Sequence, residues 1–306
     1  MSFFEAPYFT FSMKLIVFIT IAFSVCTVPM LAQEYQLRYD MPENDSYRFK
    51  QVEETTALAQ SNDGRTVEID RKTTRYLHLT VEGVSDGAIT YTVLQDTAIV
   101  EENNEDPRVQ RQNLLSQNIL TGKRIRVRQS RTGDILETRA LDPLNAREAL
   151  GPAVNDAMFV QRAAILPKLP ERTLRVNIQW TEQRGDTLQP TKTLPGYGTG
   201  NGVRYIGSST EYTVDGTETL QDRDCLVLTW KSNGSMEEAL MFETLEEFNE
   251  EFTKGSGTMK IALESGLPLW VEVYSDQETT RAIFGKQTSI IPASISTHTT
   301  LEFFSQ

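Results

Sequence analysis

The sequence predicts a mainly β protein, built as an antiparallel, strongly curved sheet or half-open barrel with a short central helical segment. Apolar and polar residues alternate over long stretches. Val67, Ile69, Leu77, Leu79 and Val81, for example, share one parity, with two arginines and a threonine between them. A repeat of two residues is that of a β-strand, whereas a helix repeats every 3.6 residues. Turn-forming dipeptides recur between these stretches, which is the pattern of strands joined by hairpins.

The N-terminal residues have the three parts of a secretory signal peptide. Lys14 is the basic part, Leu15–Val25 is the apolar part, and Pro29 precedes a short exit that ends at Gln33. The apolar part is shorter than the roughly 20 residues that span a bilayer. We therefore expect translation to start at Met13 and cleavage to follow Gln33 or the residue before it. The mature chain would be exported, periplasmic or secreted, without a transmembrane segment.

The two cysteines are expected to play no chemical role. Phe23 stands where a lipobox has Leu, and the branched Val25 directly precedes Cys26, so we expect no lipid anchor at Cys26. Cys225 lies in an apolar run, where a buried and unreactive thiol is expected.

The chain is acidic, with 42 Asp and Glu residues against 30 Lys and Arg residues and a net charge of −12. This balance opposes binding to nucleic acid or to anionic membranes, which requires clustered basic residues. One short basic cluster, Lys123–Arg128, alternates with Ile125 and Val127. The alternation predicts that these basic side chains form the solvated face of a strand.

Four segments are expected along the chain. Residues 1–33 form an N-terminal extension and the signal peptide, residues 34–142 a first β-rich half, residues 143–170 a helical bridge, and residues 171–306 a second β-rich half. The two halves can belong to one domain.

Turn sequences divide the first half into hairpins. We expect turns at Asn62-Asp63-Gly64, Asp86-Gly87 and Thr132-Gly133-Asp134, because Gly tolerates the positive φ of tight turns. Each half also contains one Tyr-Thr-Val strand, Tyr91–Val93 and Tyr212–Val214, which suggests two repeated β-units.

The helical bridge is expected to begin at Asp142-Pro143, because Asp can cap a helix and Pro fits its first turn. Leu144, Leu150 and Val154 follow near helical spacing. Gly151-Pro152 interrupts the pattern, so two short helices are predicted.

The second half resumes the alternation of strands and turns. Turns are expected near Arg184–Asp186 and at Asp215-Gly216, Asn233-Gly234 and Ser265-Gly266. The segment Pro190–Gly202 is rich in Pro and Gly and is expected to be a loop.

One acidic stretch, Glu237–Phe252, allows two interpretations. Met241, Leu245 and Phe248 follow helical spacing toward Phe252, which favours a solvated amphipathic helix. The alternative is a long strand hairpin that ends at Gly255-Ser256-Gly257.

The residue patterns indicate no catalytic, cofactor-binding or metal-binding residues. His78 and His298 lie on predicted strands, opposite the apolar parity and without the clustered ligands of a metal site. The nucleophile motifs of serine hydrolases and the P-loop are missing from the sequence. Gly196–Gly200 lacks the strand and helix that flank a nucleotide-binding loop, so a surface loop is expected.

Acidic and aromatic residues leave other functions open. The acidic tracts Glu101–Asp106 and Glu237–Glu251 lack the order of a calcium-binding loop, and we interpret them as solvated surface. Carboxylates are numerous enough for a glycosidase-like pair. Aromatic residues on the predicted strands are expected in the core, or along a cavity for an apolar ligand if the sheet is strongly curved.

The chain resembles an uncharacterised family of exported bacterial β proteins, of the Bacteroidota type, a domain of unknown function. The resembling parts are Tyr47–Gln51, Leu169–Trp180, Glu211–Val227 and Gly257–Pro268, which extend over most of the mature chain. Leu174–Trp180 keeps the family's Trp but lacks the Gly-Asp turn before it. The resemblance implies no activity and no functional residue. In architecture alone, the chain is also similar to periplasmic lipoprotein carriers, which suggests a half-open barrel around an acyl chain.

The sequence thus predicts an exported, non-enzymatic envelope protein without cofactors that binds a lipid or another apolar ligand. The alternatives are a structural or protein-interaction module of the envelope and, less favoured, a carboxylate-dependent hydrolase.

Overall fold

The structure is a computed structural model that describes residues 33–60, 66–85, 87–104, 107–151, 154–194, 197–285 and 288–304. Tyr35–Gln306 forms one compact unit. The apolar part of the predicted signal peptide, Cys26 and the predicted turn at residues 62–64 lie outside the described residues.

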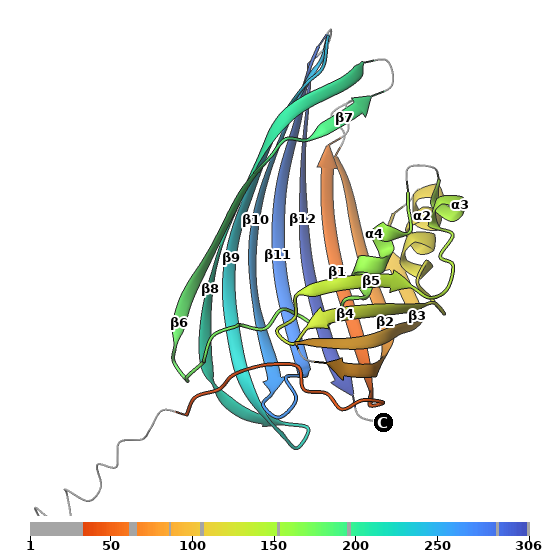
Figure 1. Ribbon diagram of the computed structural model, residues 1–306. Coiled ribbons are helices and arrows are strands. Elements are labelled where there is room, and N and C mark those ends of the chain that lie inside the picture. The colour runs from red at the N-terminus through yellow and green to blue at the C-terminus, as the bar shows by residue number, and fades with distance from the viewer. Residues whose placement is uncertain are drawn as a thin grey trace, which may run out of the picture. The chain divides into compact units, whose positions relative to one another are not determined.

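Every strand of the described chain belongs to one sheet, and all of the strand pairs are antiparallel (Figure 1). The strands are β1 (Ser46–Gln60), β2 (Thr66–Ser85), β3 (Ala88–Glu102), β4 (Arg124–Ser130), β5 (Ile135–Ala140), β6 (Gln179–Leu188), β7 (Thr191–Leu194), β8 (Gly198–Leu220), β9 (Arg223–Met241), β10 (Glu246–Ala262), β11 (Pro268–Phe284) and β12 (Ser289–Phe304). Their order is β5-β4-β3-β2-β1-β12-β11-β10-β9-β8-β6, with β7 beside β8. The sheet is open, with β5 and β6 at its edges, which confirms the predicted mainly β, antiparallel, half-open fold.

The helices of the described residues are short and lie between β3 and β6 in the chain. They are α2 (Pro107–Asn118), α3 (Ala146–Leu150), α4 (Ala157–Val160) and the 3-10 helix η1 (Gln161–Ala163). The last three confirm the predicted central helical segment. The predicted start at Asp142 is wrong, because the Asp142 carboxylate instead binds the Arg124 guanidinium at 3.0 Å and α3 begins four residues later. Helix α2 was not predicted, because its sequence has only a weak apolar stripe. Within the described residues, no helix is both long and apolar enough to cross a membrane.

The core lies on one face of the sheet, which we call the inner face. Phe49, Leu79, Tyr91, Val127 and Leu301 are buried there at alternate strand positions. The N-terminal segment at residues 35–41 and the helical segment pack over these side chains in one continuous cluster. Burial of each such side chain contributes about 1.5–3 kcal/mol, so this layer stabilises the end of the sheet that it covers.

Strands β8–β12 extend beyond the core cluster toward an end that we call the tip, where Phe242–Leu245 joins β9 to β10 (Figure 1). Between core and tip, residues 231–237 and 249–256 are half-buried or exposed on both faces. The side chains there are mostly Ser, Thr, Asn, Glu and Gly. Cross-strand pairs of polar residues, rather than apolar burial, therefore hold this part of the sheet.

Three turns predicted in the second half are wrong. Arg184–Asp186 lies inside β6, and Asn233-Gly234 lies inside β9 opposite Lys254. Asp215-Gly216 lies in β8 as a bulge, where the register with β9 shifts. The turn between β8 and β9 is at Gln221 and Asp222, both with positive φ. Strand pairing keeps these segments extended: β8 and β10 flank Asn233-Gly234 on both sides, and β8 pairs with Arg184–Asp186 on one side. The turns at residues 132–134 and 265–266 are confirmed.

The acidic stretch Glu237–Phe252 is a strand hairpin, so its interpretation as a helix is wrong. The Phe242 N–H donates to the Leu245 carbonyl at 2.8 Å and closes the turn. Met241 and Phe252, whose spacing suggested a helix face, are 64% and 51% exposed. Strand β10 then continues through Gly255–Gly257. Pro190–Gly202 is also not a loop alone, because it contains β7 and the start of β8.

Candidate functional site

A pocket of about 410 Å³ lies between the inner face of β1–β4 and the helical elements α2 and η1. Five charged side chains line it: Glu53, Arg71, Arg75, Lys123 and Arg162. Leu77, Val93, Leu120, Ile125 and Ala163 form its apolar wall, which is continuous with the core. The pocket therefore joins a charged region to an apolar one.

The alternation of β2 places the arginines at the site. Arg71, Thr73 and Arg75 have the parity of the buried Leu77, so they lie on the inner face where the apolar core ends. On the neighbouring strand β1, Glu53 pairs with Thr73, and Gln51 pairs with Arg75. Strand pairing thus brings two guanidinium groups beside one carboxylate.

Arg75 is held by acceptors on two sides. Its Nη1 donates to Gln51 Oε1 at 3.0 Å and to Glu53 Oε2 at 3.2 Å. Its Nη2 donates to Gln117 Oε1 at the end of α2. Gln95 Nε2 in turn donates to the Gln117 carbonyl at 3.1 Å. Arg75 is therefore a fixed, 13% exposed cation that links α2 to the sheet.

Arg71 and Thr73 retain unused hydrogen-bonding capacity. Arg71 Nη2 lies 3.8 Å from Glu53 Oε1, but its buried Nε has no acceptor among the described residues. Thr73 is fully buried, and within the described chain its Oγ1 has no partner. Most buried polar atoms in proteins are paired, so two unpaired ones on adjacent inner-face positions need a physical explanation.

Arg162 approaches the pocket from η1, opposite the sheet. Its guanidinium carbon lies 4.8 Å from the centre of the Phe159 ring. Partial burial, together with the nearby guanidinium groups of Arg75 and Arg71, lowers the pKa of Arg162, and Glu53 opposes this effect only in part. The lowered pKa of Arg162 thus reflects burial first and the neighbouring positive charges second.

The pocket therefore has four cationic side chains and one carboxylate in a chain whose net charge is −12. Partial burial makes the interaction of such charges with a ligand stronger than in water. An anionic group would relieve the repulsion among the arginines and accept their free hydrogen bonds. A cation or an uncharged apolar molecule would do neither.

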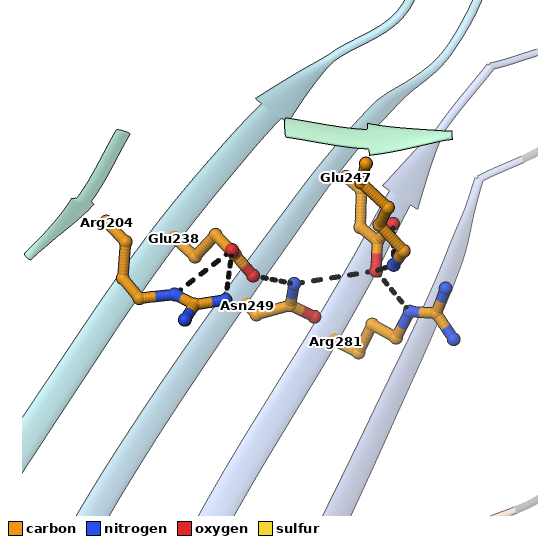
Figure 2. Close-up of polar contacts among 6 residues, drawn as sticks. Arg204, Glu238, Glu247, Asn249 and Arg281 are labelled. Atoms are coloured by element: carbon orange, nitrogen blue, oxygen red, sulfur yellow. Dashed lines mark hydrogen bonds and ion pairs between the residues drawn. The ribbon is translucent and has the colours of Figure 1, made fainter. Parts of the chain in front are cut away.

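Near the tip, a second polar cluster surrounds two buried carboxylates (Figure 2). Arg204 Nη2 lies 2.6 Å from Glu238 Oε1. Asn249 Nδ2 donates to Glu238 Oε2 at 3.2 Å and lies 3.5 Å from Glu247 Oε1. The Nε of Arg281 donates to Glu247 Oε1 at 2.8 Å.

Lys192 on β7 completes this cluster, with its Nζ 2.8 Å from Glu247 Oε2. Burial alone would raise the pKa of Glu247, but hydrogen bonds from Lys192 and Arg281 lower it below its usual value. A general acid in a hydrolase needs a raised pKa. Within this cluster, the Lys192–Glu247 ion pair links β7 to β10.

The two histidines lie on the face opposite the core. His298 stacks on Tyr274 with ring centres 4.3 Å apart, and its Nε2 lies 3.0 Å from Glu272 Oε1. His78 Nε2 is buried, and no residue of the described chain hydrogen-bonds to it. Across the described ranges, no group of three or more His, Cys, Asp or Glu residues is placed to hold a metal ion.

The remaining sequence features have structural roles. Cys225 is buried, and burial raises the pKa of its thiol. Arg124, Arg126 and Arg128 are exposed on β4, while Ile125 and Val127 between them are buried, which confirms the predicted solvated strand face for the three arginines. Lys123 precedes β4 and is half-buried at the pocket, so the prediction is wrong for this residue. Gly200 of the glycine-rich segment belongs to β8 and lies against the ring of Phe242, the residue that follows β9.

The sequence did contain a signal for the pocket. Arg71 and Arg75 occupy positions of the apolar parity, so they had to lie on the inner face. Alternation alone could not show that Arg162, far away in the chain, would lie across from them.

Comparison with known proteins assigns no family. Neither a family model nor a curated protein matches the chain. Among solved structures, OpdQ of Pseudomonas aeruginosa is similar over 85% of this chain and 100% of its own, with 7% identity and a TM-score of 0.27. OmpF of Salmonella typhi, in complex with daunomycin, is similar over 84% and 98%, with 6% identity and a TM-score of 0.24. An outer membrane channel from Pseudomonas putida F1 is similar over 87% and 98%, with 7% identity and a TM-score of 0.19. Likenesses this weak support no conclusion about function.

Proposed function

We propose that this chain is an exported, non-enzymatic envelope protein that binds a small amphiphile with an anionic head group in the pocket between β1–β4, α2 and η1. The observation that carries the proposal is the excess of cations there: among the described residues that line the pocket, Arg71, Arg75, Lys123 and Arg162 stand against one carboxylate, that of Glu53. The signal-peptide pattern at the N-terminus supports export. The resemblance to the uncharacterised exported family remains part of the proposal and adds no activity to it.

The head group of the ligand would lie at the arginines. Guanidinium groups bind carboxylate and phosphate oxygens through paired, charge-assisted hydrogen bonds. Arg71, Arg75 and Arg162 all line the pocket, so their guanidinium groups could donate to such oxygens. Both carboxylates and phosphates fit this chemistry.

The apolar part of the ligand would lie along Leu77, Val93, Leu120 and Ile125, which line the same pocket. The sequence alone suggested a lipid or another apolar ligand, and the pocket adds that this ligand carries an anionic group. An uncharged apolar molecule would leave the arginines desolvated without an acceptor, which is costly. The volume of about 410 Å³ is in the range of small-molecule sites.

A series of ligands with one tail and different head groups tests the proposal. Octyl phosphate, octanoate, octanol and octyltrimethylammonium would be titrated calorimetrically into the mature chain. We expect the two anions to bind at least about tenfold more tightly than octanol, because each charge-assisted hydrogen bond contributes about 1.5–3 kcal/mol. The cation should not bind. Equal affinity for octanol and octyl phosphate would refute the anionic head group.

Variants locate the binding to this pocket. Arg71→Gln and Arg162→Gln should each weaken octyl phosphate binding by about tenfold or more and leave the weak octanol binding nearly unchanged. Arg147→Gln is the matched control, because Arg147 is exposed on α3 and does not line the pocket. If all three variants bind octyl phosphate like the original chain, the site lies elsewhere.

A further inference from the structure

Strand β6 forms an open edge of the sheet. It pairs with β8 along its whole length, from Gln179 opposite Thr213 to Leu188 opposite Arg204. On its other side, no strand of the described chain pairs with it. Edge strands present free backbone donors and acceptors, and proteins cover, charge or pair them.

The direction of the free backbone groups follows from three contacts. Just before β6 the Ile178 carbonyl accepts from the Val214 N–H, and just after it the Pro190 carbonyl accepts from the Gly202 N–H. The even-numbered residues of β6 therefore direct their backbone N–H and C=O groups toward β8. The Thr187 N–H instead donates to Oδ1 of its neighbour Asp186 at 2.8 Å. Because backbone direction alternates along an antiparallel strand, the odd-numbered residues of β6 direct their N–H and C=O groups outward.

The even-numbered side chains of β6 alternate in charge. Glu182, Arg184 and Asp186 follow one another on the inner face. Arg184 Nη2 lies 3.5 Å from Glu182 Oε2, and the two side chains are 64% and 38% exposed. The edge therefore presents both an unpaired backbone and a specific order of charges.

We propose that two copies of this chain pair antiparallel through β6, about a twofold axis at Gln183. In this register Glu182 of each copy lies opposite Arg184 of the other. Gln179 lies opposite Thr187 and Thr181 opposite Gly185, so all of the outward-facing residues are used. A twofold axis normal to the sheet keeps the two inner faces on the same side, and the two sheets become one continuous sheet.

Neighbouring registers are disfavoured by charge and geometry. A shift that centres the pair on Arg184 brings the two arginines together and opposes Glu182 with Asp186, and a centre at Glu182 opposes two glutamates. Like charges directly across a strand pair are destabilising. A centre between residues 183 and 184 would place backbone groups that point out from the edge opposite groups that point toward β8, so the hydrogen bonds between the two copies would be lost. A centre at Gly185 opposes Arg184 with Asp186 but leaves Gln179 and Thr181 unpaired.

The test is the oligomeric state of the mature chain, measured by sedimentation velocity at concentrations up to about 1 mM. We expect a concentration-dependent dimer. Glu182→Arg and Arg184→Glu should each weaken dimerisation by at least about tenfold, because each brings like charges together. The double variant E182R/R184E restores the complementary pairs and should restore the dimer. Glu211→Arg is the control, because Glu211 lies on β8, away from the edge.

A second substitution tests the backbone pairing. Gln183→Pro removes an outward-facing N–H and should abolish the dimer, with folding checked by circular dichroism. A monomer at every concentration would overturn the proposal, as would a dimer that tolerates the single charge reversals. Loss of the dimer in R184E but not in E182R would overturn the register centred on Gln183 in favour of the one centred on Gly185.

Discussion

At the scale of the residue, polar side chains at inner-face positions are the informative ones. Arg71 and Arg75 mark the candidate pocket, and Glu247 holds the cluster at the tip. Each lies on the strand face whose positions closer to the core carry apolar side chains. A charged group at such a position requires a partner, since burial without one is costly. Glu247 has its partners in the chain, whereas the Nε of Arg71 has no acceptor among the residues that the structure describes.

Glu247→Gln should destabilise the protein by about 1–3 kcal/mol, because Lys192 and Arg281 lose their counter-ion. This is less than for a wholly buried pair, since the two cations are 39% and 45% exposed. The free energy of unfolding is measured by urea titration. Glu246→Gln, on the exposed neighbour in β10, is the control.

The pH dependence of that difference gives a second measurement. The pKa of Glu247 is lowered in the folded chain, so its contribution to stability is fully present above the ordinary Glu pKa of about 4.3. The contribution is lost as the pH falls through the lower, folded-state pKa. The gap in unfolding free energy between the original chain and E247Q should therefore close below about pH 4. A gap that stays constant down to pH 2 would contradict the ion-pair explanation.

At the scale of the element, neighbouring strands override local turn preference. Asn233-Gly234 is among the strongest hairpin sequences, yet it stays extended because β8 and β10 bind it from both sides. The same pairing turns Asp215-Gly216 into a bulge. Gly257, by contrast, is required for close packing. Gly257 on β10 lies under the Trp230 ring of β9, where a Cβ atom would come within 2.2 Å of Trp230 Cζ2.

Gly257→Ala should therefore destabilise the protein by about 1–3 kcal/mol, because the Trp230 ring must move away from the strand. Thermal unfolding, followed by tryptophan fluorescence, measures the effect. Gly234→Ala is the matched control. Its Cβ would lie 3.7 Å from the nearest atom, an ordinary contact, so its stability should be unchanged or higher. Equal effects of the two substitutions would show that packing under Trp230 is not the cause.

At the scale of the whole molecule, the core covers only part of the sheet. Leu226 and Leu228 of β9 are buried in it, whereas residues 231–237 farther along the same strand are half-buried or exposed. Local stability follows the number of buried apolar contacts and the protection of backbone hydrogen bonds. The sheet should therefore open locally between core and tip before it unfolds as a whole.

Hydrogen exchange tests this gradient along single strands. Amides of Ser232–Ser235 on β9 and Thr253–Ser256 on β10 should exchange faster than those of Leu226–Leu228 and Met259–Ile261, by about tenfold or more for each 1.4 kcal/mol of difference in local stability. Uniform protection along both strands would contradict the division between core and single-layer sheet.

The sequence by itself determined the class of fold, the antiparallel pairing and which side chains of a strand share a face. A repeat of two residues needs no partner to be recognised, and it placed Leu77, Leu79 and Val81 on one face of their strand, with Arg71 on the same face. Tertiary structure alone decided which of the turn-forming dipeptides lie in turns and whether Glu237–Phe252 is helix or strand. It also decided that Arg162 lines the same pocket as Arg71 and Arg75. These outcomes depend on neighbours distant in the chain, whose hydrogen bonds and charges outweigh local preference.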